Sequence, residues 1–188
     1  MKELEDRQVV QAIVERNADG LAGLYDRYSG LLTALTRRIL HNQSDTEEIL
    51  QETFLQVWNQ AERYDPTRSS VSTWLVLIAR SRAIDRLRSG KVVDRTISAA
   101  QKEQGPAHAS SKGVSAVLTH ERRERLRQEM DTLPVEQREV LELAFYQGLT
   151  QSEIATRTNT PLGTVKTRTL LAMKKLRIAL ESEIKELL

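Results

Sequence analysis

Cysteine is absent from the 188-residue sequence, and aromatic residues make up only 4% of it. Without cysteine the chain has no disulfide, no thiolate zinc site and no cysteine nucleophile. Glycine and proline are also scarce, at 8 and 4 residues. Because helix-breaking residues and β-branched runs are both few, the sequence predicts an all-α protein.

Several kinds of functional motif are missing as well. The three histidines, His41, His108 and His120, show no metal-ligand spacing, so neither a metal site nor a cofactor is predicted. There is no glycine-rich phosphate loop and no nucleophile elbow, which argues against an enzyme with a small-molecule substrate. No apolar run reaches the length of a membrane span, and the N-terminal stretch lacks an apolar signal-peptide core. We therefore expect a cytoplasmic protein with no membrane contact of its own.

The net charge is only +2, but it is distributed unevenly. Residues 45–65 carry six acids and one base, whereas residues 80–95 carry six bases and two acids. Residues 161–180 carry five bases and no acid. One acidic and two basic segments suggest at least two kinds of partner. Each segment taken singly is also compatible with an ordinary solvated helix face.

Apolar residues recur at helical spacing through the first half of the chain. One series runs through residues 21–39, and a second runs through residues 50–61, with Ser44 or Asp45 available as its N-cap. A third helix is expected over residues 71–88, ending in a basic stretch. In that helix Trp74 is interpreted mainly as a core residue.

The composition then changes, which predicts a boundary between two domains. The stretch SAAQKEQGPAHASSKG has few large apolar residues and cannot bury enough surface to order itself. We expect a first helical domain over residues 1–90, a flexible linker over residues 91–113 and a second helical domain over residues 114–188. The second domain begins with a highly charged helix.

The stretch GLTQSEIATRTNTPLGTVKTRTLLAMKKL has the pattern of a helix-turn-helix. Thr150 and Glu153 are in capping-box register, and Asn159 stands at the turn, where a left-handed backbone is often needed. The second helix is expected to bury Leu162, Val165, Thr169, Ala172 and Leu176. Its outward face would then carry Lys166, Thr167, Leu170, Leu171 and Lys174. Such a face fits a DNA major groove, although a basic helix that packs on another protein is an alternative.

Longer segments resemble a known family. The stretch LPVEQREVLELAFYQGLTQSEIATRTNTPLGTVKTRTLLAMKKLR resembles region 4 of bacterial sigma factors of the extracytoplasmic-function (ECF) group. In the first half, LYDRYSGLLTALTRRIL, DTEEILQETFLQVW and STWLVLIARSRAIDRLR are similar to three helices of region 2. Both regions occur in the family's order with a linker between them.

The resemblance implies a function and a set of partners. The chain would bind core RNA polymerase, through the β′ clamp and the β subunit, and direct it to promoter DNA. An anti-sigma factor is implied in the same way. Catalysis would belong to the polymerase. The alternative is a stand-alone helix-turn-helix regulator whose first half is a regulatory domain.

The resemblance also assigns residues to each partner. The implied polymerase contacts are Asp45, Glu48, Gln51, Glu52, Leu55 and Trp58. For Trp58, core packing is an equal alternative to polymerase contact. The implied minus-ten DNA contacts are Arg63, Tyr64, Asp65, Ser69, Ser70, Ser81, Arg82, Asp85 and Arg86. The implied minus-thirty-five DNA contacts are Thr164, Lys166, Thr167, Arg168, Leu170, Leu171 and Lys174.

Three positions depart from the family's pattern. Ser81 stands where asparagine is frequent, which weakens any transfer of base preference because serine offers fewer hydrogen-bonding groups. Asn159 replaces the usual glycine of the turn. Leu171 stands where a basic residue is frequent. We expect Leu170 and Leu171 either to contact thymine methyl groups or to form an apolar patch that an anti-sigma factor or region 2 covers.

Overall fold

The computed structural model describes residues 2–97 and 127–180. Within these ranges every regular element is a helix, which confirms the all-α prediction. The chain divides into two compact units, Met1–Ala109 and Ser110–Leu188. The expected linker lies largely outside the described residues.

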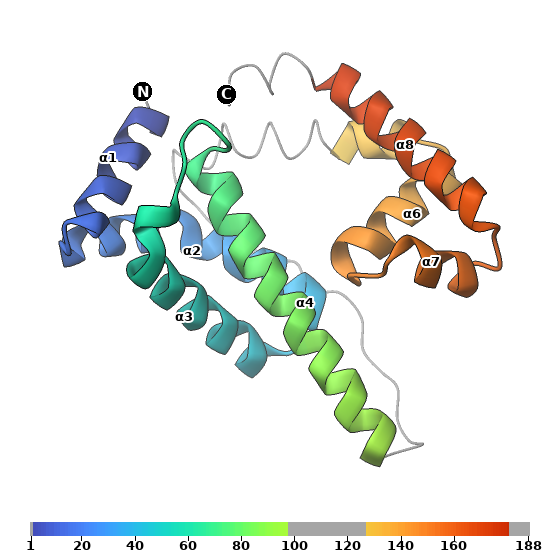
Figure 1. The fold of residues 1–188 in the computed structure, drawn as a ribbon, viewed down its shortest axis with the longest axis horizontal. Helices are drawn as coiled ribbons and strands as arrows, with labels where there is room; N and C mark the ends of the chain where they lie inside the picture. Colours follow the sequence, from blue (N-terminus) through green and yellow to red (C-terminus); the bar gives the residue numbers. More distant parts are fainter. Residues whose placement is uncertain (1, 98–126, 181–188) are drawn as a thin grey trace. The chain divides into compact units, whose positions relative to one another are not determined.

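The first unit is built around helix α2 (Ala18–Leu40), which packs against α1 (Lys2–Val14), α3 (Gln43–Gln60) and α4 (Val71–Ile97) (Figure 1). A short 3-10 helix, η1 (Ala61–Arg63), follows α3. The apolar stripes that the sequence predicts on α2, α3 and α4 meet in one core. The fully buried side chains at its centre include Leu24, Leu32, Val57, Val71 and Leu75.

Gly20 allows α1 and α2 to cross closely. A Cβ atom at this position would lie 3.0 Å from the Val9 carbonyl oxygen and 3.1 Å from Cγ1 of Ile13. Because one of these neighbours is backbone, it cannot move aside cheaply. A glycine is therefore favoured where the two helices meet.

The second unit consists of α6 (Val135–Tyr146), α7 (Gln151–Arg157) and α8 (Leu162–Ala179). Its core contains Val140, Leu143, Ile154 and Val165. Gly148 has a φ of 63° between α6 and α7, and it ends α6 as expected from the sequence. The helix that the sequence predicts before α6 is described only over residues 127–132.

Helix ends differ from the sequence-based expectation at two places. Asn42, not Ser44 or Asp45, caps α3, because its Oδ1 accepts a hydrogen bond from the Asp45 amide at 3.0 Å. Helix α4 continues past Arg88 to Ile97, so residues 91–97 of the expected linker are helical. The single glycine there costs only about 1 kcal/mol in a helix, and no proline interrupts the chain.

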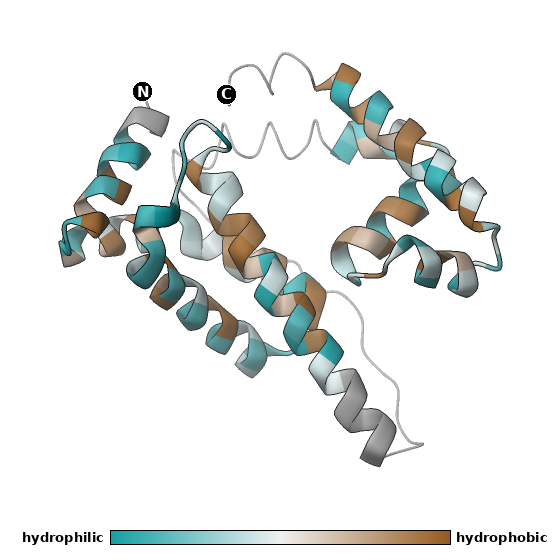
Figure 2. Ribbon diagram, in the orientation of Figure 1, coloured by the Kyte–Doolittle hydropathy of each residue, from teal (hydrophilic) through white to brown (hydrophobic). Residues whose placement is uncertain are grey.

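The apolar residues are distributed differently along α4 and along α8. In Figure 2 the apolar residues of α4 alternate with polar ones along its first half, as expected for a helix with one buried face. Helix α8 differs, because several of its apolar side chains are exposed: Leu162, Leu170, Leu171, Met173 and Ile178. Burial of Leu162 was therefore a wrong expectation. It is the first residue of α8 and is 38% exposed.

Candidate functional site

The acidic face of α3 is presented as the sequence predicts. Glu48 and Gln51 are exposed, and Leu55 is 59% exposed despite being apolar. Asp45 and Glu52 are half-buried beside them. One helix face thus combines carboxylates, an amide and an apolar side chain, which is a composition suited to a protein partner.

Trp58 lies at the edge of this face and also packs on the core. The Arg16 guanidinium lies 5.6 Å from the centre of the Trp58 ring, and Arg16 Nη1 donates to the Trp58 carbonyl oxygen at 3.1 Å. These contacts support the core-packing interpretation of Trp58. Its contact with polymerase stays a prediction.

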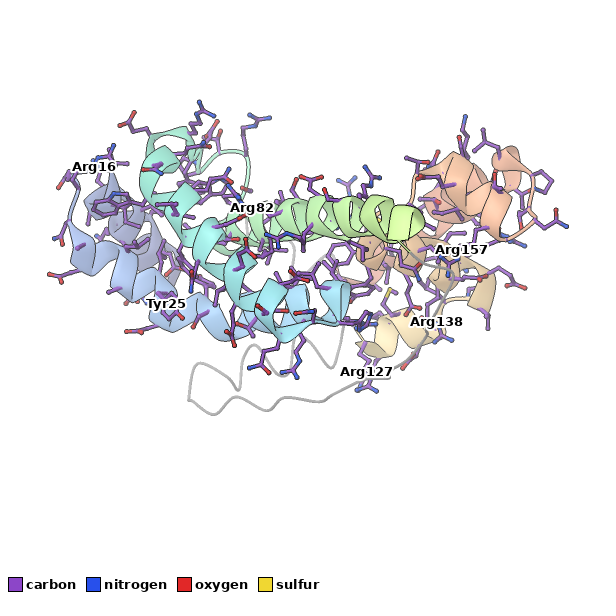
Figure 3. All side chains as sticks on the ribbon, turned by 90° about the horizontal axis from the view of Figure 1, so that it is seen from below. Arg16, Tyr25, Arg82, Arg127, Arg138 and Arg157 are labelled. Carbon is purple, nitrogen blue, oxygen red and sulfur yellow. The ribbon has the colours of Figure 1, made fainter. Side chains whose placement is uncertain are left out.

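Arg82 of α4 reaches across to α3 (Figure 3). Its Nη1 donates to Glu52 Oε2 at 2.5 Å, and its Nε donates to Gln56 Oε1 at 2.8 Å. A predicted DNA contact is therefore bonded to a predicted polymerase contact. Helical spacing within either segment does not indicate this pairing between α3 and α4.

Arg86, one turn further along α4, bonds to the same face of α3. Its Nη2 lies 2.6 Å from Glu48 Oε1, and its Nη1 donates to Glu48 Oε2 at 2.8 Å and to Asp45 Oδ1 at 3.0 Å. Glu52 Oε1 lies 3.8 Å from Nη2. The Arg86 guanidinium thus lies within ion-pair distance of three carboxylates, those of Asp45, Glu48 and Glu52.

Helix geometry explains why these side chains meet. Positions 45, 48 and 52 are three and four residues apart, so they share one face of α3, and positions 82 and 86 share one face of α4. The Arg86 hydrogen bond lowers the pKa of Glu48, and the same bond raises the pKa of Arg86. Both shifts favour the charged pair. We name these five side chains, Asp45, Glu48, Glu52, Arg82 and Arg86, the interhelix ion-pair cluster.

A shallow depression on α4 gathers three of the predicted minus-ten residues: Ser81, Arg82 and Asp85. Its volume is about 480 Å³, and its other walls come from Gln56, Trp74, Leu77 and Ile78. Ser81 and Asp85 are exposed there. The depression therefore combines hydrogen-bonding groups with an aromatic and aliphatic wall, as a site for an unstacked base requires.

The loop between η1 and α4 is held by its own hydrogen bonds. Asp65 Oδ1 accepts from the Thr67 amide at 2.9 Å and from the Thr67 hydroxyl at 2.7 Å, and these bonds lower the pKa of Asp65. The Tyr64 hydroxyl donates to the Ser69 carbonyl oxygen at 3.0 Å. The Tyr64 ring also lies 5.2 Å from that of Trp74, which packs on the core as expected. The loop is thus a preformed turn.

The Ser70 side chain joins the end of this loop to the start of α4 by a hydrogen bond. Its Oγ accepts from the Thr73 amide at 3.2 Å at the start of α4, and the residue is only 6% exposed. The exposed groups of the loop are instead Arg63, Asp65, Thr67 and Arg68. Arg68 and Thr67 were not singled out from the sequence, although their polarity within a turn was a signal for them.

The helix-turn-helix has the local geometry that the sequence predicts. Thr150 and Glu153 form a reciprocal capping box at the start of α7. Asn159 adopts a φ of 47° in the turn before α8. Thr160 then hydrogen-bonds back to the Ala155 carbonyl oxygen at 3.0 Å. These contacts fix the angle at which α8 leaves the turn.

The outward face of α8 carries the predicted minus-thirty-five residues. Val165 and Ala172 are buried beneath it, whereas Arg168 is half-buried on its flank. Leu170 is 69% exposed and Leu171 is 43% exposed, so neither is a core residue. The remaining exposed members of the set are Thr164, Lys166, Thr167 and Lys174.

Among residues 2–97 and 127–180, His, Asp and Glu form no group of three or more that could hold a metal ion. In the same part of the chain, none of the helices has both the length and the apolar character that a bilayer span needs.

Comparison with known proteins identifies the family. The chain matches Sigma-70 region 2 over residues 24–92 and Sigma-70 region 4 over residues 123–176. It is 35% identical to the ECF RNA polymerase sigma factor SigK of Mycobacterium sp. (strain KMS) over 163 residues, which cover 85% of this chain and 82% of SigK. This chain belongs to the ECF group of the sigma-70 family. It is therefore an RNA polymerase sigma factor.

A second relative supports the same assignment. The sigma factor is 33% identical over 162 residues to the ECF RNA polymerase sigma factor RpoE of Cereibacter sphaeroides, covering 86% of this chain and 87% of RpoE. A solved structure of Rhodobacter sphaeroides SigE in complex with the anti-sigma ChrR is 30% identical, with a TM-score of 0.46 and coverage of 90% of this chain and 94% of SigE. The region 2 match disfavours the alternative of a stand-alone regulator.

Proposed function

We propose that this sigma factor divides its work among three helices. Helix α3 docks on core RNA polymerase, at the β′ clamp, while α4 and the loop before it bind the melted minus-ten strand. Helix α8 reads the minus-thirty-five element as duplex DNA. Transcription chemistry belongs to the polymerase, and the protein acts in the cytoplasm, where its template is.

The docking role of α3 is supported by one observation above all. Gln51 and Leu55 are exposed on the same face as Glu48. Neither side chain is part of the hydrophobic core cluster of the first unit. An exposed leucine among carboxylates adds apolar contact area to charge complementarity. Such a face suits a partner surface that is basic with an apolar centre.

The role of α4 is supported by the depression around Ser81 and Asp85. Trp74 and Leu77 offer apolar surface for a base, and Arg82 offers a guanidinium beside it. Stacking surfaces and cations together bind single strands without requiring a duplex. The preformed loop before α4 offers Asp65 and Arg68 as further exposed polar groups for the same strand.

The role of α8 is supported by its exposed face. Lys166 and Lys174 can contact phosphates, which fixes the helix in register on the duplex. Leu170 and Leu171 then lie where base edges are read, and apolar side chains contact the thymine methyl group there. The two leucines are also suited to an anti-sigma partner, since exposed apolar patches mark protein interfaces.

Charge reversal on α3 tests the docking assignment. Glu48→Lys with Glu52→Lys should weaken binding to core RNA polymerase at least about tenfold, because two favourable pairs become repulsive. Glu15→Lys with Asp26→Lys makes the same charge change on exposed residues of the same unit and serves as the control. Thermal melts exclude unfolding of either variant. Undiminished capture of core enzyme by the α3 variant would overturn the assignment.

A further inference from the structure

Arg16 stands where a glycine is expected. Helix α1 ends in a turn in which the Arg16 amide donates to the Ile13 carbonyl oxygen at 2.9 Å and the Asn17 amide donates to that of Ala12 at 2.9 Å. In such a turn the residue at the position of Arg16 is left-handed and is usually glycine. Arg16 adopts a φ of 63° there, although it carries a side chain. A side chain kept on a strained backbone points to a task for that side chain.

The Arg16 side chain is bound to the end of α3. Its Nη1 donates to the Trp58 carbonyl oxygen at 3.1 Å, and its guanidinium lies 5.6 Å from the centre of the Trp58 ring. Trp58 is among the last four residues of α3, whose carbonyl groups have no partner within the helix. A positive charge is also favourable at the negative end of the helix dipole. Arg16 therefore fixes the last turn of α3, shortly before η1 begins.

Two further contacts of α1 hold the chain beyond this point. Helix α1 packs against η1, and Val10 and Ile13 of α1 belong to the same buried cluster as Ala61 of η1. Arg7 Nη2 lies 3.5 Å from the Pro66 carbonyl oxygen in the loop that follows. The segment from the end of α3 to the middle of that loop is thus held along its length by α1.

The loop of residues 64–70, which we name the minus-ten loop, depends on its two ends for its placement. Its internal hydrogen bonds make it a preformed turn. A turn that is rigid within itself is displaced as one body when either end moves. Ser70 fixes one end at α4. Arg16 fixes the other end, because the three-residue η1 is all that separates α3 from the loop.

We propose that Arg16 is a positioning residue for promoter recognition: by fixing the end of α3, it sets where the minus-ten loop stands when it receives an unpaired base. The proposal rests on the proposed minus-ten role of the loop, and it adds the contact that holds the loop in place. Arg16 acts through Trp58 and η1 and not on the DNA itself. Its strained backbone is retained because glycine, which would relieve the strain, has no side chain to reach Trp58.

Arg16→Gly separates positioning from stability. The substitution removes the contacts with Trp58, but it also relieves the left-handed strain, so the melting temperature of the full-length chain should change little. His41 is the matched control, since it has a φ of 55° at the end of α2 and is exposed. It lies at the opposite end of α3 from Trp58. His41→Gly thus relieves the same kind of strain without altering the support of the minus-ten loop.

The measurement is selection by the holoenzyme from promoter DNA with randomised minus-ten and minus-thirty-five regions, at core-enzyme concentrations that saturate each variant. Arg68→Gln, a change of an exposed side chain within the loop, first identifies the base positions that the loop reads. At these positions we expect Arg16→Gly to weaken the base preference about threefold or more, as for the loss of one hydrogen bond. Its minus-thirty-five preference should stay unchanged, and His41→Gly should alter neither preference. Arg16→Lys, which keeps the charge and a donor, should restore part of the loss.

Three results would overturn the positioning role. One is an unchanged preference of Arg16→Gly at the positions that the loop reads. Another is a marked fall in the melting temperature of this variant, which would make Arg16 a residue for stability. The third is a uniform loss of DNA affinity with a shallower salt dependence, which would indicate that Arg16 contacts a phosphate itself.

The Arg68→Gln variant distinguishes failure of this proposal from failure of the proposed function. If Arg68→Gln changes the preference at no minus-ten position, the proposed role of the loop fails, and the positioning role of Arg16 fails with it. If Arg68→Gln changes the preference and Arg16→Gly does not, only the positioning role fails.

Discussion

Tyr28 on α2 donates its hydroxyl hydrogen to the carboxylate of Asp6 on α1. Asp6 is only 2% exposed, and its other oxygen accepts from Arg27 Nη1 at 2.5 Å. A buried carboxylate is stable only when its oxygens are hydrogen-bonded. The contact therefore holds α1 on α2, together with the ion pair between Asp6 and Arg27.

Removing the Tyr28 hydroxyl should destabilise the first unit. Tyr28→Phe leaves a buried carboxylate oxygen without this donor, and the expected loss is about 1–3 kcal/mol of unfolding free energy. Tyr25→Phe on the same helix is the control, since Tyr25 is 45% exposed and packs its ring on Phe54. Urea denaturation of both variants measures the difference. Equal stabilities would contradict the importance of the buried bond.

Replacing Asn159 by glycine should destabilise the second unit less than replacing it by a β-branched residue. Its φ of 47° lies in the left-handed region, which costs most residues about 1–2 kcal/mol. Asn159→Gly should leave stability nearly unchanged, whereas Asn159→Val should lower the melting temperature of the second unit. Differential scanning calorimetry compares the two. A stable valine variant would mean that the turn can adopt another backbone geometry.

Stability should depend on pH through the Glu48–Arg86 pair. The Arg86 hydrogen bond lowers the pKa of Glu48 from its ordinary value of 4.5. A carboxyl whose pKa is lowered on folding stabilises the protein above its unfolded pKa and loses that contribution as the pH falls through its folded pKa. The stability difference between the natural chain and Glu48→Gln should thus be present at neutral pH and shrink progressively below pH 4.5.

Urea denaturation of both proteins across that range measures the shrinkage. Glu47→Gln should show no comparable trend, because no arginine is bonded to Glu47 in the described contacts. A difference that grows on acidification would reverse the expected sign and contradict the pairing.

Leu171→Arg should change promoter preference without changing stability. Leu171 is exposed on the outward face of α8, so arginine adds a long donor there and removes an apolar contact. Val135→Arg adds the same side chain at an exposed apolar position of α6, which carries none of the predicted DNA contacts, and is the control. Selection of minus-thirty-five variants by the holoenzyme reads out the preference. Lost anti-sigma inhibition with unchanged preference would instead favour the apolar-patch role.

Periodicity was sufficient to predict most of the helices and their buried faces. Leu50, Phe54 and Val57 are buried on α3 because spacing of three and four residues follows the helix turn. The capping box and the left-handed Asn159 were predictable because each depends on a few neighbouring residues. The sequence therefore predicted correctly those features that depend only on residues close together in the chain.

Features that depend on tertiary contact were not predictable in this way. The cap of α3 was misplaced because Asn42, Ser44 and Asp45 are all competent caps in a short polar stretch. The ion-pair cluster was missed because it requires α3 and α4 to lie side by side in one register. Gly20 was missed because nothing in its own sequence neighbourhood signals the close approach of α1.

Transcription by a defined holoenzyme tests the central claim most directly. The purified chain is combined with core RNA polymerase freed of other sigma factors, and transcripts from a genomic library are mapped to their start sites. We expect start sites that core enzyme alone does not produce, sharing one sequence near minus ten and another near minus thirty-five. A folded chain that binds core enzyme yet adds no start site would contradict the account.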